Sequence, residues 1–385
     1  MDVFTNGCYK QNRILMITVG IWPDSPLIVK LFARSVILTI LCSLLPPQYA
    51  FLNHPDRHLN DLISVLIIQL VILTVVLKIC YIGFNMKMVQ NGMVRMQEDW
   101  VILKETPAID QIRRYAKRGY LISRIYIIFF FCATTQVFFV MPLKPMILDA
   151  IWPSNESRPR TYAFDADYSI FSIYENDYYW ALLHTLIIGL TLVEGIVAID
   201  TFILIIVEHC CGLFDAVGYI LQGLRKESCS LRRNKIIRDA IFVHNRALSL
   251  ADLIESSFTM MFAFVVLINM ILISMTAFET VLKVDDPGEL VRFVLFIIGQ
   301  IAHLFCTSLP GQELLDHSSR VFTDIYNSNW SEIADKEQKL LLFMLMRSMK
   351  PSYMTAGKFY TLHIENFKNV LRTSMSYFTV FLSIR

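Results

Sequence analysis

The sequence predicts an all-α membrane protein with seven transmembrane helices, and three observations support this fold class. First, the 385 residues are 55% hydrophobic and only 18% charged, with 27 phenylalanines, which is unlike a soluble domain. Second, hydropathy finds seven apolar stretches of about 20 residues, the length that a bilayer core of about 30 Å requires. Third, lysine and arginine are distributed unequally between alternate loops. The net charge of +2, without a block of like charge, argues against a nucleic-acid partner.

The seven apolar stretches follow one another along the whole chain and are the predicted spans. In order, they are Leu27–Leu45, Leu62–Phe84, Tyr120–Met141, Trp180–Val207, Phe258–Leu282, Val291–Leu309 and Tyr360–Ile384. A signal peptide is not apparent in Met1–Lys30, so we expect the first span to act as its own signal anchor.

The orientation follows from the positive-inside rule. Loops on the side of the amino terminus hold 23 lysines and arginines, against six on the other side. This difference predicts a cytoplasmic amino terminus and an extracellular carboxyl terminus. Asn155 lies in a glycosylation sequon of the long external loop and is a predicted glycosylation site, whereas the Asn329 sequon falls in the last cytoplasmic loop.

The eight cysteines fall in spans or cytoplasmic segments, so no structural disulfide is expected. Adjacent Cys210 and Cys211 lack the usual spacing of metal ligands, and the sequence predicts neither a metal nor a cofactor. Glu194 and Asp200 lie inside the fourth span but about 240° apart on a helix. We therefore expect structural pairing, with Lys78 or Arg124, rather than one shared site.

Two cytoplasmic segments are also predicted to be helical. Residues 208–257 read as an extension of the fourth helix, a basic turn around Leu231–Lys235 and a helix returning into the fifth span. Asn329 begins another helix, whose apolar run Leu340–Met346 is too short to span a membrane. We expect neighbouring subunits to cover it. Pro351 ends this helix, and Gly357 provides a flexible break before the last span.

These features divide the chain into three predicted parts. Residues 1–310 form a six-helix bundle, residues 311–359 a cytoplasmic anchor segment, and residues 360–385 a terminal membrane helix. The terminal helix carries one stripe of small polar and aliphatic side chains: Thr373, Ser376, Val380, Ser383 and Ile384. The stripe fits either a water-filled pore or close helix packing. A single such helix cannot enclose water, so a pore requires several subunits around an axis.

Specific motifs resemble the insect odorant receptor family, most clearly in the last quarter of the chain. They comprise Leu15–Pro23 near the start, Gly311-Gln312, Ser318, Val321, Ile325-Tyr326 and Trp330, and then Met346-Arg347-Ser348, Pro351, Thr355-Ala356-Gly357, Phe359, Phe367 and Arg372–Thr379. The resemblance implies a subunit of a four-subunit, ligand-gated, non-selective cation channel in the plasma membrane of olfactory sensory neurons. It further implies a tuning subunit that assembles with a common co-receptor, because residues 208–257 are shorter than the co-receptor's corresponding loop.

The resemblance also implies roles for particular residues. The terminal helix would line the pore, with Val380 and Ile384 at the closing hydrophobic positions. Ser383 stands where the co-receptor has a longer amide, which departs from the family pattern. A small, volatile, hydrophobic ligand would bind in the outer half of the bundle. The candidate contacts are Leu66, Gln69, Leu70, Thr135, Gln136, Phe139, Val140, Tyr178, Tyr179, His184, Ile188, Met270, Ser274 and Phe278. His184 also fits a hydrogen bond within the bundle.

Three alternatives remain at this point. A gustatory-type channel of the same superfamily would share the fold and the terminal pore helix. A G-protein-coupled receptor would have an external amino terminus, which the charge distribution argues against. A secondary transporter would show inverted repeats with broken helices, and the sequence has no evident internal repeat. No nucleophile, base or metal set occurs at a useful spacing, so an enzyme is not expected.

Overall fold

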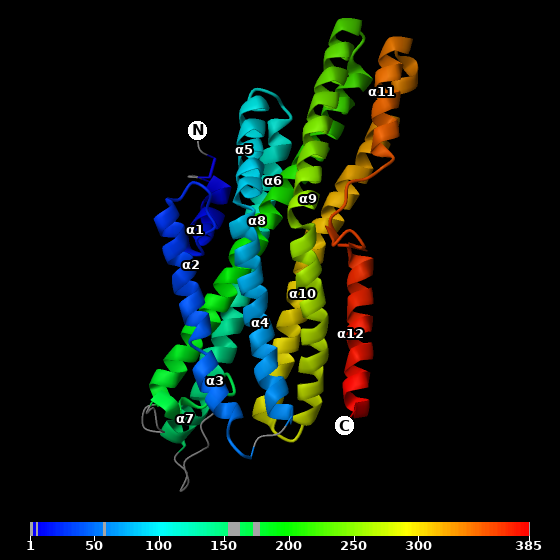
Figure 1. The fold of residues 1–385 in the computed structure, drawn as a ribbon. Helices are drawn as coiled ribbons and strands as arrows, with labels where there is room; N and C mark the ends of the chain where they lie inside the picture. Colours follow the sequence, from blue (N-terminus) through cyan, green and yellow to red (C-terminus); the bar gives the residue numbers. More distant parts are fainter. Residues whose placement is uncertain (1–2, 5–6, 57–58, 153–161, 172–177, 385) are drawn as a thin grey trace.

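The protein is an elongated bundle of long helices in a computed structural model that describes residues 3–4, 7–56, 59–152, 162–171 and 178–384 (Figure 1). The α-helices are α1 Lys10–Thr18, α2 Leu27–Cys42, α3 Leu45–Leu52, α4 Leu59–Phe84, α5 Met86–Ile102, α6 Ile109–Thr135, α7 Met141–Ile151, α8 Tyr178–Gln222, α9 Ser230–Leu282, α10 Pro287–Tyr326, α11 Asp335–Ser348 and α12 Ile364–Ile384.

Short elements connect these helices. A π-helical segment, η2 Gln136–Val140, joins α6 to α7. Single turns occur at η1 Gly7–Tyr9, η3 Tyr168–Phe171, η5 Gly223–Lys226 and η6 Trp330–Glu332. Strands β1 Thr355–Ala356 and β2 Tyr360–Thr361 pair antiparallel directly before α12.

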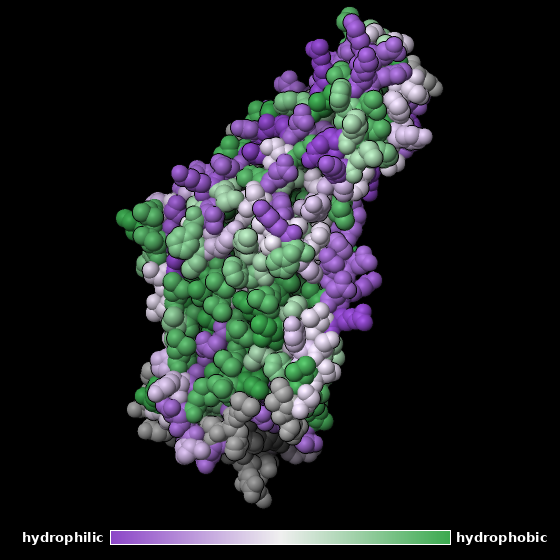
Figure 2. All heavy atoms as spheres, turned by 45° about the vertical axis from the view of Figure 1, so that its right-hand side comes forward, coloured by the Kyte–Doolittle hydropathy of each residue, from purple (hydrophilic) through white to green (hydrophobic). Residues whose placement is uncertain are grey.

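Six helical stretches in the described part of the chain are long and apolar enough to cross a membrane. They correspond to the first six predicted spans, which are therefore confirmed as apolar helices. The seventh, α12, is 21 residues long but more polar, since it includes Glu365, Lys368 and Arg372. Apolar side chains cover most of the middle of the face shown in Figure 2, and polar side chains gather mainly towards its upper end. This distribution is the one that a bilayer-spanning bundle requires.

Helices α8 and α9 form the centre of the bundle. In their most apolar windows 72% and 67% of residues are buried, against 17% for the first span, so the outer helices surround these two. Close packing depends on small residues in α8. A Cβ atom at Gly195 would lie 2.5 Å from Cγ1 of Val75, so only glycine lets α4 approach α8 this closely.

Several predicted boundaries require correction. The turn between α8 and α9 lies at residues 223–229, and the basic residues Arg232, Arg233 and Lys235 are already helical in α9. The last helix begins at Ile364 rather than Tyr360. The expected flexible break at Gly357 is instead an ordered hairpin, in which Gly357 and Lys358 both have φ of 67°. Glycine suits this left-handed conformation because it lacks Cβ.

Helix α10 continues without interruption across residue 310, where the six-helix bundle was predicted to end. Pro310 is tolerated inside this helix, and its side chain is buried. The loops predicted to be cytoplasmic and those predicted to be extracellular nevertheless lie at opposite ends of the bundle. The amino terminus, the α5–α6 and α8–α9 connections and α11 lie towards one end, and the α9–α10 connection lies at the other (Figure 1).

Candidate functional site

A cavity of about 130 Å³ lies between five helices of the bundle. Its wall is mostly aliphatic and aromatic, and Thr74, Thr134, Asn269, Gln300 and His303 contribute the polar groups. The apolar part consists of Ile68, Val71, Phe130, Ala133, Val137, Phe138, Gly189, Leu192, Val193, Ile196, Leu272, Leu295, Phe296 and Gly299. A cavity with this lining suits a small apolar molecule whose orientation is fixed by few polar contacts.

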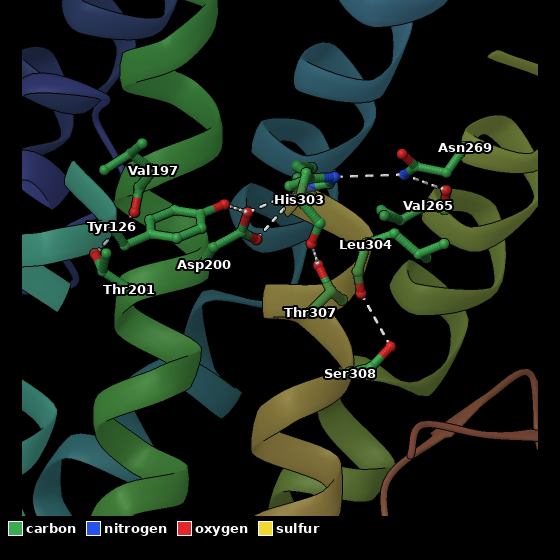
Figure 3. Close-up of polar contacts among 11 residues, drawn as sticks. Tyr126, Val197, Asp200, Thr201, Val265, Asn269, His303, Leu304, Thr307 and Ser308 are labelled. Carbon is green, nitrogen blue, oxygen red and sulfur yellow. Dashed lines mark hydrogen bonds and ion pairs between the residues drawn. The ribbon is translucent and has the colours of Figure 1, made fainter. Parts of the chain in front are cut away.

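A buried polar cluster adjoins the cavity at His303 (Figure 3). Asp200 of α8 accepts hydrogen bonds from Lys78 Nζ at 2.6 Å and from the Tyr126 hydroxyl at 2.9 Å. Lys78 contacts Oδ1 of this carboxylate, and Tyr126 contacts Oδ2. His303 Nε2 lies 3.0 Å from the same Oδ2. Lys78 is 1% exposed, so its buried ammonium charge is stabilised by the ion pair with Asp200. The predicted pairing is confirmed for Asp200, whose partner is Lys78, whereas Glu194 forms no ion pair with a described residue.

Asn269 of α9 extends the cluster and indicates the histidine tautomer. Its Nδ2 donates to the Val265 carbonyl oxygen at 2.9 Å and lies 3.5 Å from His303 Nδ1. An amide nitrogen only donates, so Nδ1 accepts and the proton of a neutral His303 is on Nε2, facing Asp200. The cluster thus joins α4, α6, α8, α9 and α10 across the centre of the bundle.

The fourteen ligand-contact candidates lie on the expected helices, but none of them lines this cavity. Leu66, Phe139, Val140 and Tyr179 have at least 37% of their surface exposed and face the outside of this single chain. The cavity is lined by residues that are close in sequence to the candidates but lie on another face of the helix. For example, Gly189 lines the cavity, whereas the adjacent candidate Ile188 does not. Contact between ligand and these fourteen residues remains a prediction.

Several of the polar candidates have structural partners. The His184 ring lies between the hydroxyls of Ser43 and Tyr168, at 2.8 Å from Nε2 and 2.9 Å from Nδ1, which agrees with its alternative interpretation. Gln69 is hydrogen bonded to Gln48, and the Tyr178 hydroxyl donates to the Pro142 carbonyl oxygen at 3.1 Å. Leu70, Thr135, Gln136 and Met270 lie outside the cavity wall as well.

Sequence reasoning missed the contribution of α10 to the cavity. Phe296, Gly299, Gln300 and His303 recur at three- and four-residue spacing and face the cavity together. Gln300 and His303 are polar residues inside an apolar span, and such residues are candidates for a functional site. This signal was present in the sequence.

The described part of the predicted pore stripe is accessible on the outside of the single chain. Ser376, Val380 and Ser383 are exposed, and Thr373 is half-buried. The opposite side of α12 packs against the bundle through Val370 and Ser374. The side chain of Ile384 and the glycosylation candidate Asn155 lie outside the described residues.

Helix α9 contacts both the cavity and α12. Asn269 and Leu272 line the cavity. Two residues later, the single hydroxyl proton of Ser274 is shared between the Met270 carbonyl oxygen of its own helix at 2.7 Å and the Ser374 carbonyl oxygen of α12 at 2.8 Å. The Phe278 ring lies 6.1 Å from the Phe381 ring of α12. One segment of α9 therefore contacts both the cavity and the terminal helix.

A second buried polar group occurs at the end of the bundle that carries α11. Arg118 of α6 pairs with Glu208 of α8 at 3.3 Å and with Glu313 of α10. Burial raises the pKa of the Glu208 carboxyl to about 7, despite the opposing effect of Arg118. Its Oε2 has no hydrogen-bond partner among the described residues. The ion pairs of Arg118 link α6 to α8 and α10, and we assign them a structural role.

The fold and its cavity define a polytopic helical membrane protein. The family described as 7tm Odorant receptor matches residues 58–375. Odorant receptor 13a of Drosophila melanogaster is 26% identical over 226 residues, covering 54% of this chain and 53% of that protein. Odorant receptor 10 of Aedes albopictus is 27% identical over 97 residues, covering 25% and 26%.

A solved structure shares the fold over nearly the whole length. The insect olfactory receptor OR5 from Machilis hrabei in complex with eugenol has a TM-score of 0.77 at 11% identity, covering 98% of this chain and 97% of that chain. A second structure of the same OR5 receptor gives a TM-score of 0.73 at 12% identity. The sequence matches span about half the length of the first curated relatives. The chain belongs to the 7tm odorant receptor family, whose members are receptors and not enzymes.

Proposed function

We propose that this protein is the ligand-binding tuning subunit of an odorant-gated, non-selective cation channel. The observation that carries the proposal is the position of α9, which lines the cavity on one side and holds α12 on the other. Ligand in the cavity shifts α9, and α9 shifts the terminal helix. Hydrophobic side chains on that helix then cease to close the pore.

The pore consists of the stripe of Thr373, Ser376, Val380, Ser383 and Ile384 from each of several subunits. Ser376, Val380 and Ser383 are exposed in the single chain, which fits a surface that faces water in an assembly. Val380 and Ile384 form the hydrophobic gate. The partner is the common co-receptor, in a heteromer of four subunits in the plasma membrane of olfactory sensory neurons.

The ligand is a small volatile molecule, held mainly by apolar contacts in the 130 Å³ cavity. An engineered cavity of about 150 Å³ in another protein binds benzene, so a single ring or a short chain is the expected size. The structurally similar OR5 has been solved in complex with eugenol. Eugenol is therefore a suitable member of the first test panel.

Voltage clamp of cells that express this chain, the co-receptor, or both tests the proposal. A rapid cation current to volatiles that the co-receptor alone ignores, persisting with G-protein signalling blocked, is the expected result. Surface-expressed heteromer without current to any volatile would contradict it. In the same cells, Val380→Ala should change basal current while the ranking of active volatiles is retained.

A matched pair of glycine variants tests the cavity itself. A Cβ at Gly189 would lie 2.8 Å from Cγ of Phe138, so Gly189→Ala pushes this ring and reduces the space for ligand. Gly299 also lines the cavity, but a Cβ there meets no atom within 4 Å. We expect Gly189→Ala to raise the half-maximal concentration of larger volatiles more than that of smaller ones. Gly299→Ala should have a much smaller effect, and equal effects would argue against this cavity.

A further inference from the structure

The amide of Gln300 is a polar group of the cavity wall that holds a buried acceptor without a partner among the described residues. Gln300 is 7% exposed and lines the cavity from α10. Its Oε1 is buried and has no hydrogen-bond partner among the described residues. A buried acceptor without a donor is unfavourable, and such groups are rare in folded proteins unless a ligand or water completes them.

The orientation of this amide is fixed by its neighbour on α9. Gln300 Nε2 donates to Thr276 Oγ1 at 3.1 Å, and Thr276 Oγ1 donates its single proton to the Leu272 carbonyl oxygen at 2.7 Å. A reversed amide would bring Oε1 against an oxygen that has no proton left to give. The group that remains unsatisfied is therefore an acceptor.

The neighbouring polar groups do not supply the missing donor. Thr74 donates its hydroxyl proton to the Leu70 carbonyl oxygen at 2.9 Å. Asn269 directs its amide nitrogen to Val265 and His303, and His303 directs its Nε2 to Asp200. No described residue donates a proton to Gln300 Oε1, so a ligand or a water molecule in the cavity has to supply the donor.

We infer that this cavity selects small volatile hydrogen-bond donors, namely phenols and short alkanols, through the Oε1 of Gln300. The inference rests on the proposed function and adds the ligand's chemical class to it. A hydroxyl both fits an otherwise apolar site and completes the acceptor. An ether of equal size leaves the acceptor unpaired, and sites built to bond a hydroxyl discriminate strongly against analogues that lack it.

Isomeric pairs test this inference without any variant. In cells that express the heteromer, 4-methylphenol is compared with anisole, and 1-hexanol with 1-methoxypentane. The isomers of a pair have the same heavy-atom count, and they differ in whether the oxygen carries a proton. We expect the hydroxyl compounds to act at concentrations about ten- to a hundredfold lower than the ethers.

The Gln300→Met variant then assigns the preference to this side chain. Methionine keeps a similar length and removes the acceptor, so the potency ratio within each pair should fall close to one while ether responses persist. Gln90→Met, at an exposed position of α5 outside the cavity wall, serves as the control and should keep the wild-type ratio.

The outcomes separate the inference from the proposed function. If volatiles evoke current but ethers equal their hydroxyl isomers, or all four compounds are silent, the ligand class is wrong and the channel assignment stands. If the wild-type preference survives in Gln300→Met, another group recognises the hydroxyl and the inference fails. If the surface-expressed heteromer responds to no volatile, both proposals fall together.

Discussion

The Asp200 carboxylate shows how a single residue organises the interior of this bundle. It accepts hydrogen bonds from Lys78, Tyr126 and His303, which come from three different helices. In a membrane interior, where water is not available, these bonds replace the solvation that a charge would otherwise lose. We interpret the cluster as structural, because its donors are all directed at the carboxylate.

Replacing Asp200 with asparagine should therefore destabilise the protein strongly. The amide cannot neutralise the buried Lys78 ammonium, and breaking one partner of a buried pair costs about 3–5 kcal/mol. Thermal unfolding in detergent and the amount of surface protein are the measurements. The double variant Lys78→Met with Asp200→Asn should recover much of the loss.

Glu194→Gln provides the matched control for this prediction. Glu194 is the other carboxylate of the same span, is half-buried, and forms no ion pair with a described residue. Its replacement should change the unfolding temperature much less than Asp200→Asn does. Equal loss in both variants would show that the ion pair has no particular importance.

At the scale of elements, α9 is the connection between cavity and terminal helix. Its cavity-lining residues Asn269 and Leu272 lie within two turns of Ser274 and Phe278, which contact α12. A long helix is a stiff element, so a small shift at the cavity reaches α12 with little loss. Coupling through α9 is thus local and does not require a conformational change of the whole bundle.

The hydrogen bond of Ser274 to α12 offers a direct test of this coupling. Interhelical hydrogen bonds in membranes average about 0.6 kcal/mol, equivalent to about a threefold change in an equilibrium constant. Ser274→Ala should change the maximal current by about that factor, with the ranking of ligands preserved, in whole-cell recordings. Thr280→Ala is the control, because its hydroxyl bonds only to the Thr276 carbonyl oxygen of the same helix. A changed ligand ranking in Ser274→Ala would instead place this residue in the binding site.

At the scale of the whole molecule, α11 presents an apolar face that the single chain leaves uncovered. Phe343 is 71% exposed and Met346 58%, and Met349, directly after the helix, is 67% exposed. The sequence predicted an apolar helix here that neighbouring subunits cover. Its exposure, at the end of the molecule away from the α9–α10 connection, fits an anchor that holds several subunits together (Figure 1).

Charged substitutions on this face should prevent assembly. Phe343→Asp combined with Met346→Asp places two carboxylates where apolar side chains would be desolvated, and this arrangement opposes association. Size-exclusion chromatography with the co-receptor should show loss of the heteromer, while the isolated subunit keeps its unfolding temperature. Lys336→Asp, an exposed charge reversal on the same helix, should leave the heteromer intact. Assembly that survives the double substitution would assign the contact to another surface.

The sequence by itself determined the class of fold, because a bilayer requires helices of fixed length and apolar composition. It also indicated an ion pair for Asp200, with Lys78 or Arg124 as the partner, because a buried charge in a membrane is stabilised by an opposite charge. The polar stripe of α12 followed from helical periodicity alone. All three depend on local composition or on a strong chemical requirement.

Only the tertiary structure decided which face of each helix meets the cavity. In an apolar span nearly every side chain is suitable for ligand, lipid or a neighbouring helix, so hydropathy does not distinguish the three. The candidate Ile188 and the cavity residue Gly189 are adjacent in sequence but lie about 100° apart on a helix. Gln300 gained its importance from Thr276 and Leu272, whose bonds fix its amide, and such contacts between separate helices are formed only by folding.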